Sequence, residues 1–401
     1  MFTARLLLTC LLVLFVSACG SGSRSDPPEI APEPTAVPRN LTVIDVASES
    51  VTLRWEPIET AEAYYLYYAS EPFEDVNNIH AYRDGEWQAD VSSPYKVTGL
   101  TNNTTYYFLV TAMIDGAESP PGFSVNATPV DTLSGPQPSA EEVRVIELIN
   151  RARRDPEQEV ERHSQVNDLN EGLDPPTLTA TQKAPLAFNP HLMAAARDHS
   201  DWMLETNTFS HIGANGQTPH ERIAQTEYAR LHASAENISV IGRSTLNRVQ
   251  VIDDHHNQLF ASPGHRATML AEQFREVAGG EVLGPYTFEQ GTLPSSMLTQ
   301  KYALNRDRLF ITGVVYSDAN ENNFYDVGEG MENVVVTVNG SAHRAYDSGI
   351  YSVAVSANSV HRVTISGGIL PEPVEQEVEV MSRNVKLDVL VVGDEVRIDY
   401  W

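Results

Sequence analysis

The chain has 401 residues, of which 41% are hydrophobic and 20% are charged, so it can form two or three domains with apolar cores. Its 27 basic residues are outnumbered by 54 acidic ones, which gives a formal charge of −27. So acidic a chain repels phosphate backbones and anionic lipid headgroups, and we expect no nucleic-acid partner and no membrane attachment through a basic surface. Both cysteines, Cys10 and Cys19, lie close to the start of the chain, which leaves none downstream for a disulfide framework or a cysteine zinc site.

The first residues have the features of an export signal. Arg5 precedes an apolar run, Leu6 to Val16, that is too short to span a membrane. The following Val16-Ser17-Ala18-Cys19 resembles the lipobox of bacterial lipoproteins. That resemblance implies removal of residues 1–18 as a signal peptide and acylation of Cys19. The alternative is an ordinary secretory signal that is cleaved nearby.

A tether is expected after the signal. Residues 19–37 are rich in Gly, Ser and Pro, a composition that stays solvated instead of packing into a core. Gly20 stands where an aspartate would indicate retention in an inner membrane. We therefore expect an exported lipoprotein anchored in the cell envelope, at the outer membrane or the cell surface.

Residues 38–129 show the pattern of an all-β domain. Apolar and polar residues alternate in several runs, and clusters of turn-forming residues separate these runs. The segments VTLRWEP, with Trp55, and GLTNNTTYYFLVTA, with Tyr106, resemble the buried-tryptophan strand and the tyrosine-corner strand of a fibronectin type III domain. The resemblance implies a β-sandwich. We assign it a spacer role, because its tyrosines have the spacing of packing residues.

A linker over residues 130–138 leads into a helical region. Ser139 and Glu142 form a capping box, which predicts that a helix begins there. Apolar residues at helical spacing predict a second helix after Pro190 and a third over residues 244–261. The inward residues of the third helix are expected to be Leu246, Val249, Ile252, Leu259 and Phe260.

Residues 139–303 resemble the CAP superfamily (cysteine-rich secretory proteins, antigen 5 and pathogenesis-related proteins), in its cysteine-free bacterial branch. The matching segments occur in the family's order: LINRAR, PLAFNPHLMAAARDHSDWM, FSHIGANG, ENI, SPGHRATML and FREVAGG. The resemblance implies an α-β-α sandwich whose cleft holds two histidines and acidic residues.

By the same resemblance, the cleft residues are His211 in FSH, Glu236 in ENI and His265 in GHR. A second acid of many family members falls near Ser262, where this chain has no carboxylate. Two neutral imidazoles and one carboxylate suit zinc or a similar divalent ion, with one position open for water. That the three residues converge is implied by the resemblance alone.

Other histidines of this region are weaker candidates. His256 follows Ile252 by four residues on the inward helix face, so it is either a fourth cleft residue or a core histidine bonded to a backbone carbonyl. His255 is expected to point away from that face and to be solvated. His199 lies among alanines on the buried stripe of the second helix, which favours a core role.

Nucleophilic catalysis has little support in the sequence. There is no Gly-x-Ser-x-Gly elbow and no glycine-rich phosphate loop. His220-Glu221 begins like a zinc-protease helix, but Ala224 stands where the second histidine belongs. A hydrolase would have to use metal-activated water, with Glu236 as base or ligand. These features favour a function other than catalysis.

Residues 304–401 return to a β pattern. Six strand-like runs resemble the small sandwich domains of bacterial surface proteins, of the carboxypeptidase-regulatory or collagen-adhesin B type. Between the first two runs lies DANENNFYDVGEG, which matches an EF-hand-like calcium loop with Asn323 at the usual glycine position. The alternative is a solvated acidic turn. The calcium ligands would be Asp318, Asn320, Asn322, the Phe324 carbonyl, Asp326 and Glu329.

The sequence thus predicts a multidomain chain: a fibronectin-like β-sandwich, an α-β-α CAP sandwich and a C-terminal β-sandwich. Three functions are compatible with it. The CAP cleft binds a metal ion or a small hydrophobic, lipid or envelope ligand; or it is a metal-assisted hydrolase of cell-wall or peptide bonds; or the β domains form an adhesive scaffold. The missing second acid and the lack of a nucleophile favour binding.

Overall fold

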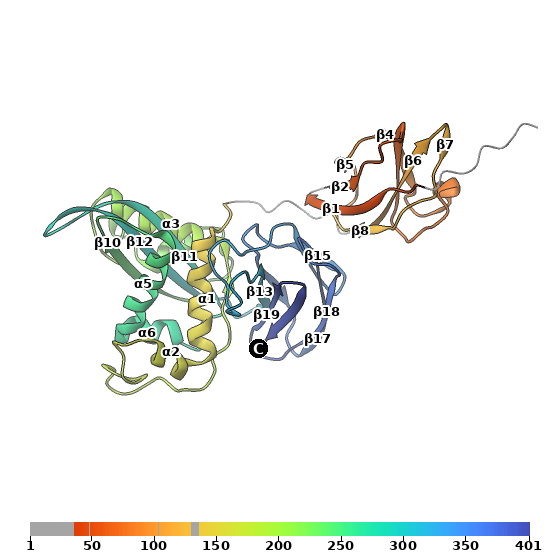
Figure 1. Ribbon diagram of the computed structural model, residues 1–401. Coiled ribbons are helices and arrows are strands. Elements are labelled where there is room, and N and C mark those ends of the chain that lie inside the picture. The colour runs from red at the N-terminus through yellow and green to blue at the C-terminus, as the bar shows by residue number, and fades with distance from the viewer. Residues whose placement is uncertain (1–35, 48, 103, 130–135) are drawn as a thin grey trace, which may run out of the picture.

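The computed structural model describes residues 36–401 apart from residues 48, 103 and 130–135 (Figure 1). The predicted signal, the lipid attachment site Cys19 and most of the tether lie outside the described residues. No helix of the described part is long and apolar enough to cross a membrane.

The first domain is a β-sandwich, as predicted. Trp55 and Tyr106 are both buried, and the Tyr106 hydroxyl accepts the backbone N–H of Thr101 at 3.2 Å, which closes the tyrosine corner. One sheet has the order β1 (Arg39–Ala47), β2 (Ser50–Glu56), β5 (Tyr95–Thr98). The other has the order β4 (Glu86–Val91), β3 (Ala63–Ala69), β6 (Tyr106–Ile114), β7 (Ala117–Glu118), with β8 (Val125–Ala127) also on β6.

The second domain has a four-stranded sheet between helices. The sheet order is β10 (Ala233–Gly242), β12 (Gly291–Leu304), β11 (Glu276–Phe288), β9 (Ala187–Phe188), and only β9 runs parallel to its neighbour. The capping box of Ser139 and Glu142 is present at the start of α1. The helices are α1 (Ala140–Arg154), α2 (Pro156–Arg162), α3 (Pro190–Glu205), α4 (Pro219–Ala224), α5 (Arg248–Ala261) and α6 (Pro263–Leu270).

Two adjacent glycines of β11 show how the layers are stacked. Neighbouring residues of a strand face opposite sides of the sheet. A Cβ at Gly279 would lie 3.0 Å from Val145 of α1, whereas a Cβ at Gly280 would lie 2.3 Å from the backbone nitrogen of Arg197 in α3. Helices α1 and α3 therefore cover opposite faces, which confirms the α-β-α sandwich, and α3 approaches too closely for any side chain at position 280.

The third predicted helix begins later than expected. Helix α5 starts at Arg248, because the side chain of Asn247 caps it by accepting the N–H groups of Val249 and Gln250. Leu246 lies outside the helix, and Val249 is 45% exposed instead of inward. Ile252, Leu259 and Phe260 are buried as predicted.

The third domain consists of two four-stranded sheets. One has the order β16 (Ile350–Val355), β13 (Leu309–Ser317), β19 (Val385–Val392), β20 (Glu395–Tyr400). The other has the order β15 (Ser341–Arg344), β14 (Val334–Val338), β17 (Ser359–Gly367), β18 (Val374–Val380). The predicted sandwich is thus present, and the acidic loop joins β13 to β14.

The second and third domains share one hydrophobic core. A single cluster of buried side chains includes Val145, Ile149 and Phe188 of the second domain together with Tyr316 and Tyr325 of the third. A buried ion pair reinforces it: Lys386 of β19 lies 2.9 Å from Glu147 of α1 and also binds Asp388 of its own strand. Figure 1 shows α1 beside the third domain, and the shared cluster of buried side chains packs the two together.

Glu147 gives this interface a pH dependence. Burial raises its pKa to about 7, against the attraction of Lys386, so the folded chain holds a proton that the unfolded chain releases. Stability should therefore fall as the pH rises from the ordinary glutamate pKa of about 4.3 through 7. We expect Glu147→Gln to remove this dependence in urea denaturation at pH 5.5 and 8.5. The exposed control Glu157→Gln should behave like the parent chain, and a parent equally stable at both pH values would contradict the assignment.

Candidate functional site

Glu236 is the centre of the candidate site. It lies on β10 directly opposite Lys301 of β12, and the Lys301 ammonium donates to its Oε2. Arg222 of α4 donates from Nη2 to the same oxygen at 2.7 Å. His211, in the loop after α3, donates from Nδ1 to Oε1 at 2.8 Å. Both oxygens of the carboxylate are thus engaged by neighbouring side chains.

These contacts fix the charge of Glu236. Burial alone would raise the pKa of this carboxyl, but the hydrogen bond from His211 and the cations Lys301 and Arg222 lower it to about 2. Burial lowers the pKa of Lys301 to about 8 in spite of the attraction of Glu236, so the lysine is still protonated at neutral pH. One buried carboxylate is thus matched by two buried cations, and its negative charge is neutralised before any ligand arrives.

His265 approaches the site from α6. Its backbone carbonyl accepts from Asn237, the residue after Glu236 on β10, at 3.2 Å. Because β10 is an edge strand, side chains from both faces of the sheet can meet beside it. Burial lowers the pKa of His265, and the charge of His211 lowers it further, so the two imidazoles lie in each other's field. The buried Nδ1 of His265 has no hydrogen-bond partner.

The site offers a metal ion two ligands, His211 and His265, and not the three that the sequence predicts. The ligand atoms of His211, Glu236 and His265 do not gather as a metal-binding group among the described residues. Glu236 is already paired with two cations, which oppose a third positive charge. His211 and His265 are neutral-imidazole donors of the type that zinc accepts, and they are the residues that would hold a divalent ion.

His256, expected as a fourth cleft residue or a core histidine, lies in a different cluster. Its Nε2 donates to Glu159 Oε1 at 2.8 Å, and His163 contacts the same oxygen at 3.1 Å. These three residues are the group whose ligand atoms lie within 4.8 Å of one another. However, Arg151 binds both oxygens of Glu159, at 2.7 and 2.9 Å. The cluster is therefore a hydrogen-bonded hub that joins α1, α2 and α5, and its partner is a carboxylate instead of the expected backbone carbonyl.

Two other histidine expectations can be compared with the structure. The prediction that His255 is solvated is wrong: it is fully buried and hydrogen-bonds the hydroxyls of Ser239 and Ser296, which belong to strands of the sheet. His199 is buried as predicted and contacts the backbone carbonyl of Ser210 at 3.0 Å. It also lies 3.8 Å from Glu236, so it forms the back of the candidate site.

Sequence reasoning missed Arg222 and Lys301. Lys301 faces Glu236 through strand pairing across 65 residues, and no local pattern specifies that register. Arg222 lies on a six-residue helix whose apolar pattern is too short to show a face. The one available signal was chemical: a buried carboxylate needs a cationic partner, and this chain has few lysines to supply one.

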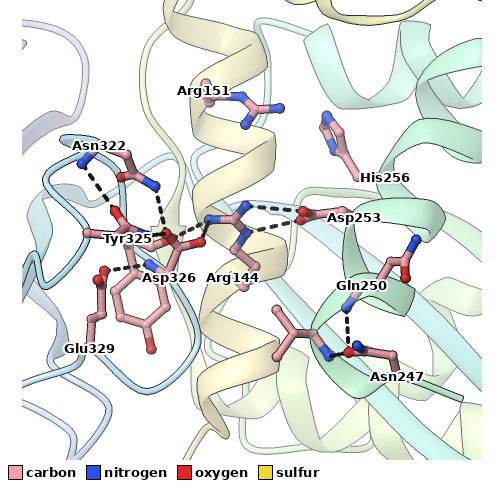
Figure 2. A network of polar contacts seen from close by, with 12 residues as sticks. Arg144, Arg151, Asn247, Gln250, Asp253, His256, Asn322, Tyr325, Asp326 and Glu329 are labelled. Atoms are coloured by element: carbon pink, nitrogen blue, oxygen red, sulfur yellow. Dashed lines mark hydrogen bonds and ion pairs between the residues drawn. The ribbon is translucent and has the colours of Figure 1, made fainter.

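The acidic loop folds around its own oxygen atoms (Figure 2). Asp318 accepts the N–H groups of Asn322 and Asn323, and Glu329 accepts those of Ala319 and Asp326. Asn323 has a φ of 57°, the left-handed conformation expected at the sixth position.

Helix α1 holds this loop through one arginine. Arg144 donates to Asp326 Oδ1 at 2.7 Å and to the Tyr325 carbonyl, and it also pairs with Asp253 of α5. Burial raises the pKa of Glu329, and the carboxylates of Asp326 and Asp318 raise it further. The loop therefore gathers negative charge that Arg144 offsets only in part.

Comparison with known proteins identifies two of the three domains. The profile of the Cysteine-rich secretory protein (CAP) family matches residues 146–288, and that of the Fibronectin type III domain matches residues 36–128. The Kelch domain-containing protein SSO1033 of Saccharolobus solfataricus is 31% identical to this chain over 102 residues. The aligned segment is 25% of this chain and only 13% of the length of that protein.

Solved structures match a similar share of the chain, about a quarter of its length. The fn3 domain of human contactin 1 is 22% identical, with a TM-score of 0.22, over 29% of this chain and 98% of that domain. An Fn3-like protein from Clostridium thermocellum is 17% identical, with a TM-score of 0.19, over 25% of this chain and 97% of its own.

The charge balance around Glu236 can be measured by removing Lys301. In Lys301→Met the carboxylate of Glu236 keeps Arg222 but loses the ammonium that donates to its Oε2, which should destabilise the fold by about 2 kcal/mol. The double variant Lys301→Met/Glu236→Gln should be less stable still, because the buried guanidinium of Arg222 then has no carboxylate partner. Urea denaturation at pH 7 measures both values. A Lys301→Met chain as stable as the parent would contradict the pairing.

Proposed function

The chain carries a CAP domain behind a fibronectin type III domain, and from this we propose that it is an exported cell-envelope protein whose CAP domain binds a small ligand without turning it over. The first domain acts as a spacer, and the third supports the CAP domain through their common core.

The state of Glu236 is the observation that favours binding over hydrolysis. A general base needs a carboxylate oxygen that is free to accept a proton from water. Both oxygens of Glu236 already accept from His211, Arg222 and Lys301, and its pKa of about 2 makes it a weak base. The chain therefore lacks the base that a metal-assisted hydrolase would require at this position.

The entrance to the cleft supports a ligand with polar and apolar parts. His211 presents 48% of its side chain to solvent, and Phe209 and Ile212 beside it are also exposed. Such residues suit a small hydrophobic or envelope ligand whose polar group meets the imidazole. A divalent ion held by His211 and His265 would supply a Lewis-acidic contact for that polar group.

Attachment through Cys19 supports the envelope location. Stable anchoring needs two or more acyl chains, which lipoprotein processing provides at such a cysteine. With residues 19–37 as a tether, the anchor would leave the three domains on the exported side.

The acidic loop is the third part of the proposal. Six oxygen donors at EF-hand positions suit calcium. Arg144 binds one oxygen of Asp326, and the amides of Asn320 and Asn322 bind the other. Since the loop touches α1 through Arg144, bound calcium would strengthen the contact between the second and third domains.

Zinc titration tests the cleft. Calorimetry on the full chain should show binding that weakens at least tenfold in His211→Gln and in His265→Gln. Binding should also weaken below about pH 6, because imidazoles must be neutral to ligate and their ordinary pKa is about 6.5. His80→Gln, which changes an exposed histidine of the first domain, serves as the control. Unchanged affinity in both cleft variants would refute the metal site.

Cell fractionation tests the anchor. Cys19→Ser removes the residue that would carry the acyl chains, so the protein should move from the membrane fraction to the soluble fraction. Cys10→Ser, within the signal segment, is the matched control and should leave the distribution unchanged. A Cys19→Ser protein that stays with the membrane would overturn lipid anchoring.

Thermal denaturation with and without a chelator tests the loop. Calcium at one hundred times its Kd stabilises by about 2.7 kcal/mol, so chelation should lower the Tm by about 5 °C. Glu329→Gln removes the bidentate anion at position 12 and should abolish the difference, whereas the exposed Asp394→Asn should preserve it. No shift on chelation of the parent chain would exclude calcium from this loop.

A further inference from the structure

A cavity lies between α3 and α4, beside the candidate site. Its volume is about 300 Å³, at the lower end of the range for ligand sites. His211, Glu236 and His265 do not line it, so it is separate from the cleft of the proposed function. The cavity and the cleft are joined through His199 and Arg222, which line the cavity and lie next to Glu236.

One wall is a single face of α3. Ala195, Asp198, His199 and Trp202 have the spacing i, i+3, i+4 and i+7, which places them along one side of the helix. The Trp202 and His199 rings are stacked, with centroids 5.5 Å apart and an interplanar angle of 10°. The wall therefore presents an aromatic pair next to the Asp198 carboxylate.

Two buried polar atoms of the wall residues have no partner. His199 contacts the Ser210 carbonyl through Nε2, which must therefore carry the proton, so Nδ1 is a lone-pair acceptor. Burial lowers the pKa of His199 to about 4, so the ring is neutral at pH 7. Nδ1 of His199 accepts no hydrogen bond, and the Nε–H of Arg222 donates none. His199 on α3 and Arg222 on α4 thus hold an acceptor and a donor that the protein leaves unused, and both atoms are shielded from bulk solvent.

Gly213 packs closely against these side chains. A Cβ at this buried glycine would lie 2.9 Å from Arg222 Nη1 and 3.5 Å from His199 Nδ1. The φ of Gly213 is −91°, which any residue can adopt, so the backbone does not require glycine here. A side chain at this position would instead press on Arg222 and His199 and displace them.

The opposite side of the cavity supplies two amides. Gln217 donates from Nε2 to Gln225 Oε1 at 3.0 Å, which leaves the Gln217 carbonyl as an acceptor and the Gln225 NH₂ as a donor. The charge of Arg222 is matched by Glu236, and Asp198 is a carboxylate. With no free cation the cavity does not suit an anion, and with few apolar residues it does not suit a lipid chain.

We propose that this α3–α4 cavity binds a neutral N-acetylated saccharide. Sugar hydroxyls donate and accept at once, which matches a wall holding both an unused donor and an unused acceptor. An acetamido group offers one N–H and one carbonyl, the complement of the free groups of Gln217 and Gln225. The Trp202–His199 pair provides the aromatic surface on which the C–H face of a sugar ring packs.

The test is calorimetric titration of the full chain with the N-acetylglucosamine trimer. We expect saturable binding that is at least tenfold weaker in Trp202→Ala and in Gln225→Ala. Trp87→Ala removes an exposed tryptophan of the first domain and should bind like the parent, as should His211→Gln in the neighbouring cleft. Trp202→Phe keeps an aromatic ring and should retain most of the affinity if Trp202→Ala fails to fold.

Three results would overturn the proposal. The first is no binding of the trimer at millimolar concentration. The second is unchanged affinity in Gln225→Ala together with loss in His211→Gln, which would place the sugar in the cleft. The third is equal affinity for maltotriose, which has no acetamido group. The zinc titration is independent of all three, so failure of the saccharide site and failure of the cleft are distinguishable.

Discussion

Helix α1 is buried on almost every side, and the arrangement of the second and third domains depends on this. Residues 142–150 are all buried, although they include an arginine and two glutamates. A helix with no free face has to supply each of its charged groups with a partner, because an unpaired buried charge is costly. Arg144 reaches Asp253 on one side and Asp326 on the other, and Glu147 meets Lys386. These pairs link the helix to both neighbours at once.

The same principle shapes the candidate site. Glu236 is buried, so it is surrounded by Lys301, Arg222 and His211, and the carboxylate that resembles a metal ligand or a base in the sequence becomes a positioning group in the fold. Its Oε1 accepts the hydrogen bond from Nδ1 of His211 at 2.8 Å. The buried carboxylate of Glu159 is likewise hydrogen-bonded by Arg151 and by two histidines, His163 and His256.

Much of the architecture could be predicted from local patterns. The capping box at Ser139, the alternation around Trp55 and the register of oxygen-bearing residues after Asp318 are all short-range signals, and the corresponding elements are present. The family resemblance correctly brought His211 next to Glu236. What could not be predicted are contacts that depend on long-range pairing, such as Lys301 opposite Glu236.

The error over His255 has a specific cause. The sequence pattern predicts that Val249 lies inward. In the structure Val249 belongs to the first turn of α5, next to the cap residue Asn247, and its side chain is exposed. The buried stripe consists instead of residues 251, 252, 255, 256, 259 and 260, so both histidines face the interior. When the first residue of a helix is predicted too early, the predicted buried face is rotated around the helix axis. Polar residues such as His255 are then assigned to the wrong face.

The common core also limits how this protein could exchange parts during evolution. The family match ends at residue 288, before β12, and the apolar cluster continues into residues 314–392. A CAP domain transplanted without the C-terminal sandwich would carry α1 with one flank bare and Glu147 deprived of its lysine. The fibronectin type III domain also packs against the C-terminal sandwich, because Val335 and Ala342 share its apolar cluster and Arg344 donates to the Val46 carbonyl. Exchange of the CAP fold alone would therefore expose apolar surface and leave a buried charge without its partner.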